Sequence, residues 1–422
     1  MIRSERRRRR RRASVAALVA VIAFAGCASD APDAISRDDV DESTAPTTTE
    51  NTEIDDAAAV LTTSETEEVA DDDADLPTER AFPDRPLGDV CPDRIVVQLA
   101  DLPSVEHGAL VRLFARLPDF DPATAGFSAP IQRIDGTIED VDLVLRTGGP
   151  AIGFRPATDA LDDPSVVLAE ATTADLVRSA GGADAVAALT DRSHAAIMWD
   201  PATHPAVGSI GDIGEAGIEV LHLTGDPLVR WLAANDVLTE SQLIPGFDGE
   251  PAAFVASGGA IAQQSDVLID PFLYEDLPQW GRPIAVAAAT DEGWESYDDL
   301  LVVSAARRVD LEECIGTFVP LVQEAIAAQV VDPSPAVDSV LASMRADVNP
   351  FTLLDADGLA AARVAAVDSG VLTTGAAAGR PVASIDLERL ARVVAELGDV
   401  LEVPPPSSRL GTNDLIDPSI AA

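Results

Sequence analysis

The chain has 422 residues, and 72 acidic against 29 basic side chains give it a formal net charge of −43. This charge argues against a nucleic-acid partner, whose phosphates require a basic surface, and against adhesion to anionic lipid beyond a covalent anchor. Apolar residues make up 47 % of the chain, enough to build one large two-lobed domain or two ordinary ones.

The N-terminal sequence predicts export from the cytoplasm. Residues 6–12 form a cationic segment, and residues 13–24 form an apolar segment too short to span a bilayer. Two small residues before Cys27 resemble the lipobox of bacterial lipoproteins, in which the cysteine is acylated. We therefore expect a signal peptide over 1–26 and a lipid on Cys27 that anchors the chain to the outer face of the cell membrane. The alternatives are an ordinary signal peptide cut nearby or a single membrane anchor.

The next segment, 27–85, consists mainly of Asp, Glu, Thr, Ser and Pro and has little periodicity. Such a composition buries too little apolar surface to offset the entropy of ordering. We predict an acidic, disordered tether that holds a folded domain, over 86–422, away from the membrane.

Two cysteines remain if Cys27 carries lipid, and they are Cys91 and Cys314. An oxidising compartment outside the cytoplasm favours a disulfide between them. By the chain-entropy argument, closing so long a loop contributes roughly 5 kcal/mol. Two unpaired buried thiols are the alternative.

Apolar runs and helical stripes alternate along the folded part of the chain. Strands are predicted at 94–99, 142–145, 165–169, 194–199, 219–223 and 283–289. Helices are predicted over 106–117, from 172 or 173 onward, and over 228–237, 250–256, 309–330 and 386–396. This alternation predicts an α/β fold with largely parallel sheets. The order of residues 331–380, rich in Ala, Gly and Asp, is left open.

Several segments follow one another in an order that resembles a known family. They are Cys91–Leu99, Pro103–Gly108, Gly148–Phe154, Met198–Pro201, Ser209–Ile213, Gly258–Gln264, Pro271–Glu275 and Thr412–Ile420. Together they resemble the substrate-binding proteins of ABC importers, in the group that serves nitrate, sulfonate and pyrimidine uptake. The resemblance covers nearly everything from Cys91 onward.

This resemblance implies a two-lobed periplasmic-binding-protein fold with a hinge. Lobe 1 is expected at about 91–198 and 281–422, and lobe 2 at about 199–280. The chain is expected to cross between the lobes near 199–213 and 264–280.

The resemblance also implies a function without catalysis. We expect a monomer that captures a small organic or anionic solute and delivers it to a membrane permease driven by an ATPase, with no cofactor. The four histidines show no metal-binding spacing, and the chain has no Gly-x-Ser-x-Gly motif, so no catalytic or metal residues are predicted. An extracytoplasmic enzyme or a ligand sensor on the same fold is the alternative.

Two residues lead the candidate ligand site. His107 begins a helix directly after a strand, where parallel sheets place their ligands and free N–H groups favour polar oxygens. Its alternative role is a capping or surface histidine. Asp101 stands where pyrimidine-binding members of the group carry Trp. A carboxylate there favours a cationic or hydroxyl-rich solute, unless the side chain points to solvent.

The remaining candidates are glycines, aromatic rings and an amide. Close backbone approach, hydrogen bonding and ring stacking are the roles expected of them. Tight turns and core packing are the alternatives. These candidates are Gly148, Gly149, Gly225, Gln264, Trp199 and Tyr274.

Overall fold

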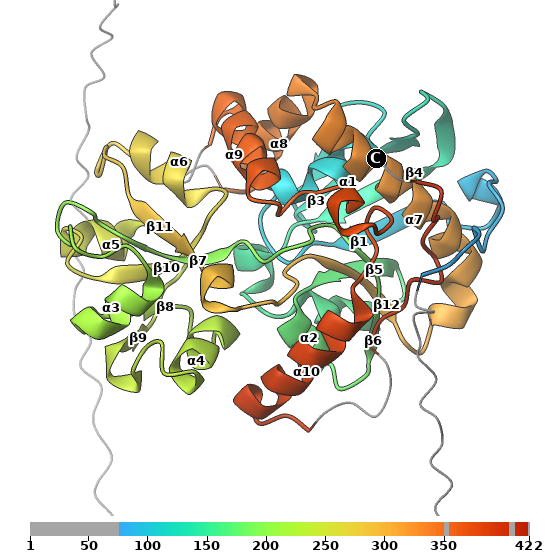
Figure 1. Ribbon diagram of the computed structural model, residues 1–422. Helices are drawn as coiled ribbons and strands as arrows, with labels where there is room; N and C mark the ends of the chain where they lie inside the picture. The colour runs from blue at the N-terminus through green and yellow to red at the C-terminus, as the bar shows by residue number, and fades with distance from the viewer. Residues whose placement is uncertain (1–75, 350–353, 405–409, 421–422) are drawn as a thin grey trace, which may run out of the picture. The chain divides into compact units, whose positions relative to one another are not determined.

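The computed structural model describes residues 76–349, 354–404 and 410–420. These residues form two α/β lobes, each built around its own sheet (Figure 1). The predicted signal peptide, the lipidation site Cys27 and most of the predicted tether lie outside the described residues.

The first lobe contains a seven-stranded sheet in the order β2-β3-β4-β1-β5-β12-β6. Its strand β1 pairs in parallel with β4 and β5, and the other pairs are antiparallel. Helices cover both faces, so Ile95 and Val97 enter one core cluster and Val96 enters another. The strands are β1 (Arg94–Gln98), β2 (Asp119–Asp121), β3 (Gly126–Gln132), β4 (Ile138–Arg146), β5 (Val166–Ala171), β6 (Ala183–Ala188) and β12 (Leu300–Ser304).

The second lobe contains a five-stranded sheet in the order β11-β7-β10-β8-β9. Strand β8 pairs in parallel with β10 and β9, whereas β7 pairs antiparallel with β10 and β11. The predicted parallel pairing therefore holds for only part of each sheet. The strands are β7 (Ala195–Trp199), β8 (Val220–His222), β9 (Leu243–Pro245), β10 (Ala262–Asp266) and β11 (Ala285–Ala288).

The second lobe is wider than the expected 199–280. Strands β7 and β11 pair with each other, with Met198 opposite Val286, and this pairing holds both of them in the second sheet. The chain therefore crosses between the lobes over 189–194 and 289–299, and not near the two segments that the sequence indicated.

Ten α-helices are assigned in the described ranges. Helices α7 and α1 cover one face of the first sheet, and α2 and α10 cover the other (Figure 1). The predicted helix over 106–117 is shorter than expected, because Phe114 already bridges to Ile131 of β3. The helices are α1 (Gly108–Arg112), α2 (Thr173–Arg178), α3 (Ile210–Ala216), α4 (Pro227–Ala234), α5 (Ala252–Ser257), α6 (Asp270–Asp276), α7 (Arg308–Val331), α8 (Pro335–Val348), α9 (Ala356–Asp368) and α10 (Leu387–Leu401).

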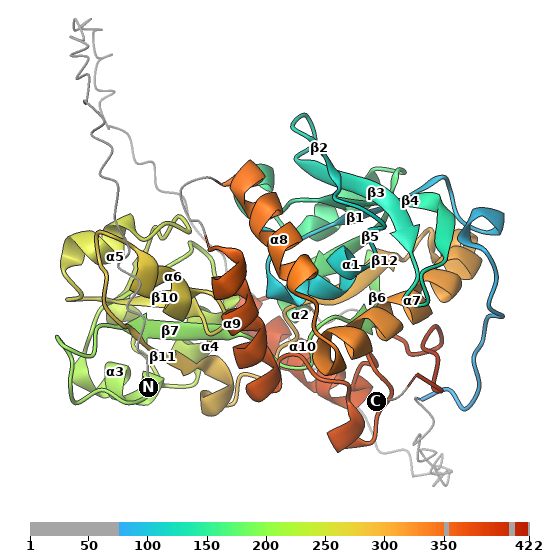
Figure 2. The same cartoon turned by 90° about the horizontal axis from the view of Figure 1, so that it is seen from above.

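Helices α8 and α9 occupy the region whose order the sequence left open. Helix α9 contacts both α6 of the second lobe and the short 3-10 helix η2 (Val105–His107) of the first. Figures 1 and 2 both place α9 where the two lobes meet.

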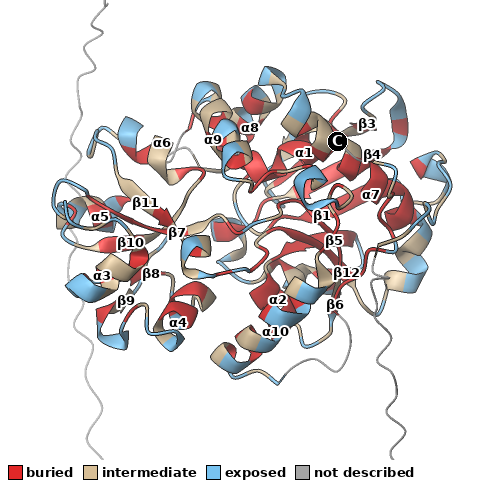
Figure 3. Ribbon diagram, viewed as in Figure 1, coloured by how far each residue is buried: buried red, intermediate tan, exposed pale blue. Residues whose placement is uncertain are grey.

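In the described part of the chain, α7 alone is long and apolar enough to cross a membrane. However, 72 % of its most apolar window is buried inside the protein, and Phe318, Val322 and Ile326 belong to the main core of the first lobe. Figure 3 shows the same helix buried along most of its length. In this structure α7 is therefore a core helix.

The fold begins before residue 86. Phe82 is packed against the core, and its ring fills the space above Gly316 of α7. Arg80 lies 3.6 Å from the Asp417 carboxylate. The last residues of the predicted tether therefore contact the domain, because an aromatic ring and an ion pair attach them.

Cys91 precedes β1, and Cys314 lies on α7, as the sequence indicated. Their Cα atoms are 4.7 Å apart and their sulfur atoms 2.16 Å apart. This Cα separation lies in the range that a disulfide spans.

Candidate ligand-binding site

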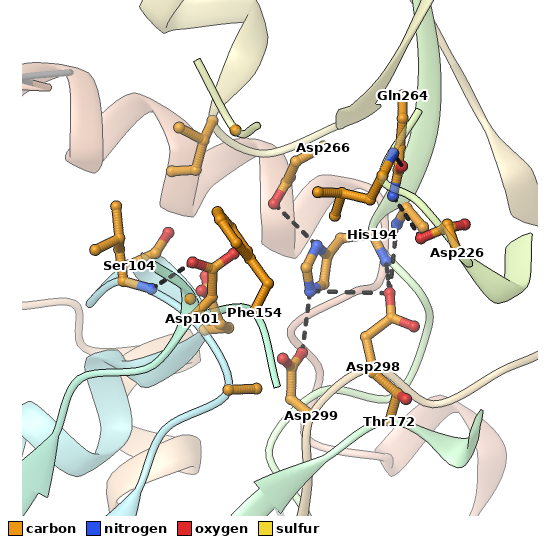
Figure 4. Close-up of a pocket in the computed structure, with 18 of the residues that line it drawn as sticks. Asp101, Ser104, Phe154, Thr172, His194, Asp226, Gln264, Asp266, Asp298 and Asp299 are labelled. Atoms are coloured by element: carbon orange, nitrogen blue, oxygen red, sulfur yellow. Dashed lines mark hydrogen bonds and ion pairs between the residues drawn. The ribbon is translucent and has the colours of Figure 1, made fainter. Parts of the chain in front are cut away.

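A pocket of about 450 Å³ opens where the two lobes meet (Figure 4). The first lobe lines it with the segment after β1 and the loop after β4, including Asp101 and Phe154. The second lobe adds the end of β10, including Gln264 and Asp266. Both crossing segments enter the pocket, which therefore touches both lobes and the hinge between them.

The pocket wall is acidic. Eleven carboxyl side chains line it, against three arginines and two histidines. The carboxyl residues are Asp101, Glu106, Glu170, Asp175, Asp226, Asp248, Glu250, Asp266, Asp270, Asp298 and Asp299.

His194 joins the two lobes through ion pairs. Its Nδ1 lies 2.9 Å from Asp266 at the end of β10, and its Nε2 lies 3.3 Å from Asp299 before β12. Asp298 is 3.8 Å from the same Nε2 (Figure 4). Burial opposes a charged ring, but Asp266 and Asp299 outweigh it and raise the pKa of His194 well above its ordinary value. A carboxylate at each ring nitrogen therefore favours the charged form of His194.

His107 lies in the pocket wall but is completely buried. The Ser104 N–H donates to its Nδ1 at 3.0 Å, so the ring proton lies on Nε2, which donates to Glu170 at 2.9 Å. Glu170 also accepts the Ala100 N–H at 2.7 Å. The ring therefore fixes the segment between β1 and η2, and both of its nitrogens are used within the protein.

Asp101 reaches the pocket from this same segment. Its Oδ1 accepts the Leu102 N–H at 2.7 Å, and its side chain remains accessible on the pocket side. The protein surrounding the other sides desolvates the carboxyl and raises its pKa. Gly149 faces Asp101 with φ +54°, and a Cβ there would lie 2.3 Å from Oδ1. Only glycine permits this close approach.

Gly148 stands behind this wall and does not line the pocket. A Cβ on it would lie 2.3 Å from the Ala100 backbone, which cannot move without shifting the Asp101 segment.

We expect Gly148→Ala to lower the free energy of unfolding by about 2 kcal/mol, as overpacking of a tight site does. Urea denaturation measures the loss. Gly88→Ala, whose Cβ would meet only atoms 3.8 Å away, is the matched control and should change stability by less than about 0.5 kcal/mol. Equal stability of the two variants would contradict this tight packing.

Four of the predicted ligand residues come together in the pocket: Asp101, His107, Gly149 and Gln264. Gln264 is already engaged within the protein. Its Nε2 donates to Asp226 at 2.7 Å, and its Oε1 accepts the Leu223 N–H at 2.9 Å.

Three other candidates lie away from the pocket lining. Trp199 is buried in a hydrophobic core cluster. Tyr274 is buried beside Phe254, and its hydroxyl accepts a hydrogen bond from Gln263 at 2.9 Å. Gly225 forms the turn before α4 with φ +79°. Core packing and a tight turn account for all three.

The sequence reasoning missed several residues that line the pocket. Asp298 and Asp299 directly precede β12, and its apolar run would have revealed their position at a strand end. Phe154 follows the Gly148-Gly149 turn. The missed residues are Ser104, Phe154, Glu170, His194, Asp266, Asp298 and Asp299. Within the described ranges, no group of three or more His, Cys, Asp or Glu residues is arranged to hold a metal ion.

No protein-family model matches the chain. No curated protein matches it either.

Solved structures of solute-binding proteins are similar to it. The periplasmic aliphatic sulphonate binding protein SsuA from Escherichia coli has 13 % identity and a TM-score of 0.48, over 78 % of this chain and 99 % of that one. A ligand-binding component of an ABC-type import system from Staphylococcus aureus, with zinc bound, has 13 % identity and a TM-score of 0.47, over 77 % and 97 %. The periplasmic nitrate-binding protein NrtA from Synechocystis PCC 6803 has 12 % identity and a TM-score of 0.42, over 78 % and 96 %.

Proposed function

We propose that the chain is an extracytoplasmic solute-binding protein of an ABC importer and not an enzyme. The observation that carries this proposal is the pocket, which is lined by both lobes and by both crossing segments. A solute in this position contacts both lobes at once, so it binds more tightly when they close on it. The closed form then docks on a permease, whose ATPase drives release.

The proposal extends to the attachment of the protein. A lipid on Cys27 anchors it to the outer face of the cell membrane, and the acidic tether lets the domain reach the permease as a monomer. A disulfide between Cys91 and Cys314 links the segment before β1 to α7. The 4.7 Å Cα separation and the oxidising compartment support this bond.

Closure of the lobes is testable with a distance measurement. Spin labels at Ile138→Cys and Glu215→Cys report on the first and second lobes, because both positions are exposed. We expect the distance between the labels to shorten when the solute that copurifies with the full chain is added back. A pair at Ile138→Cys and Val309→Cys lies within the first lobe and should not change. An unchanged interlobe distance at saturating solute would contradict the hinge mechanism.

A further inference from the structure

Carboxyl groups outnumber the cationic side chains of the pocket wall, and Glu106 among them is buried, with His107 3.3 Å away. Desolvation raises the pKa of Asp101, and it raises those of Asp270 to about 6 and Glu106 to about 7. The general acidity of the chain does not explain this arrangement, because carboxylates on an open surface are stabilised by water. Carboxylates in a pocket need a partner of opposite charge, hydrogen bonds or a proton.

Two acceptor atoms in the same wall lack a hydrogen-bond partner. Ser104 is 3 % exposed and Glu106 is 5 % exposed, yet the Oγ of the first and the Oε2 of the second are unbonded. Buried polar atoms are nearly always hydrogen-bonded, and leaving one unbonded costs about 1–3 kcal/mol. Both residues lie within five positions of Asp101, and all three line the pocket. A ligand that donates hydrogen bonds would satisfy them.

An aromatic ring projects into the same pocket. Phe154 is 47 % exposed, and its backbone adopts φ +55°, a conformation that bulky residues rarely take. A Cβ on Gly249 of the second lobe would lie 3.6 Å from the ring, so Phe154 extends from the first lobe to the second. An exposed aromatic face attracts organic cations and covers their apolar parts.

Only one of the three arginines of the wall is buried. Arg178 is paired with Asp175, and the Arg155 side chain is 68 % exposed. Arg345 alone is buried there, and its charge acts on Asp101 and Asp270, whose pKa values it lowers in opposition to burial. Its Nη1 donates to the Pro103 carbonyl at 3.0 Å and its Nε has no hydrogen-bond partner, so a single buried guanidinium faces carboxyl groups that outnumber it.

From these observations we infer that the solute is a small organic cation. Its ammonium or guanidinium group is bound by the acceptors of Asp101, Ser104 and Glu106, and its apolar part lies against Phe154. This inference rests on the proposed function and names its solute class.

Isothermal titration of the full chain in mild detergent tests the inference. The cationic probes are putrescine, agmatine and choline, and the comparison probes are methanesulfonate, nitrate and cytosine. We expect at least one cation to bind with one site per chain and no comparison probe to bind more tightly.

Asp101→Asn keeps the oxygen that accepts the Leu102 N–H, so it should fold, and it should weaken cation binding at least tenfold. Asp93→Asn makes the same charge change on the exposed surface and should leave binding unchanged.

A second pair of variants tests the ring. Phe154→Leu keeps the apolar volume but removes the aromatic face, and we expect it to weaken cation binding at least threefold. Phe154→Tyr keeps the face and should bind nearly as the natural chain does. Equal binding by the Leu and Tyr variants would overturn the role of the ring, even if Asp101→Asn did not fold.

The possible outcomes distinguish a failure of the cation inference from a failure of the proposed solute-binding function. Binding of an anion or of cytosine without any of the three cations would overturn the cation inference and leave the solute-binding function in place. Cation binding that Asp101→Asn does not weaken would overturn the assigned site. Failure of all six probes would count against both the cation inference and solute binding itself.

Discussion

Replacing both Cys91 and Cys314 by Ser should lower the free energy of unfolding by about 5 kcal/mol, the largest single effect expected in this protein. The reason is loop closure: the two residues are 223 positions apart, and a disulfide between them removes the conformational freedom of that whole loop from the unfolded chain. Cys314 is buried in the main core and Cys91 packs against it, so the disulfide lies at the core of the first lobe. Urea denaturation of the oxidised chain and of the double variant measures the difference.

Reduction provides the matched control for this prediction. Excess thiol should bring the natural chain close to the stability of the double variant and leave the variant itself unchanged. If the natural chain denatures at the same urea concentration with and without thiol, the two cysteines are not bonded. The proposed extracytoplasmic disulfide would then be wrong.

His194→Gln should lower the free energy of unfolding by about 3 kcal/mol at neutral pH. The substitution removes the cation between Asp266 and Asp299 and leaves two largely buried carboxylates unpaired, which is the costly way to break such a pair. The side chain of His194 is 18 % exposed, so the expected loss lies at the lower end for buried pairs. His204→Gln is the control, because His204 contacts the Ala260 carbonyl and no carboxylate.

The ion pairs of His194 also predict how its contribution to the free energy of unfolding changes with pH. The folded pKa of His194 is raised, so its contribution to stability is complete below the unfolded pKa of about 6.5. That contribution is lost as the pH rises through the raised folded pKa. The stability difference between the natural chain and His194→Gln should therefore shrink with increasing alkalinity. A difference that stays constant from pH 6 to pH 10 would show that His194 is not a cation in the folded protein.

The sequence predicts most clearly the strands that are buried on both faces of their sheet, because all of their residues are then apolar. Strand β1 was read correctly because Ile95, Val96 and Val97 enter two different cores and are all apolar. Strand β12 has a similar run and was missed, because Asp298 and Asp299 before it resemble a loop. Strand β3 was missed because Pro130 lies within it. Pro130 is beyond the residues paired with β2, on an edge where a sheet tolerates proline.

Helices α8 and α9 were not predicted for a different reason. Their sequences are rich in Ala and Asp, so the apolar stripe that marks a helix is faint. They are ordered by contacts with η2, α1 and α6. Such tertiary contacts leave no periodic signal in the sequence.

The site was predictable only where its residues follow strands that the sequence had revealed. Asp101 and His107 follow β1, and the Gly148-Gly149 turn follows β4. His194, by contrast, meets Asp266 and Asp299, which follow it by 72 and 105 positions in the sequence, and only the two crossings between lobes bring them together. Since those crossings were expected elsewhere, the central ion-pair cluster of the pocket could not be anticipated.

Native mass spectrometry of the full chain, released from mild detergent and purified without refolding, tests the central claim most directly. The proposed function predicts a complex with one small solute per chain, and the isolated solute should raise the melting temperature when it is added back. A chain that carries only its own mass, and whose melting temperature no cation, anion or neutral solute of the probe set raises, would contradict a solute-binding function.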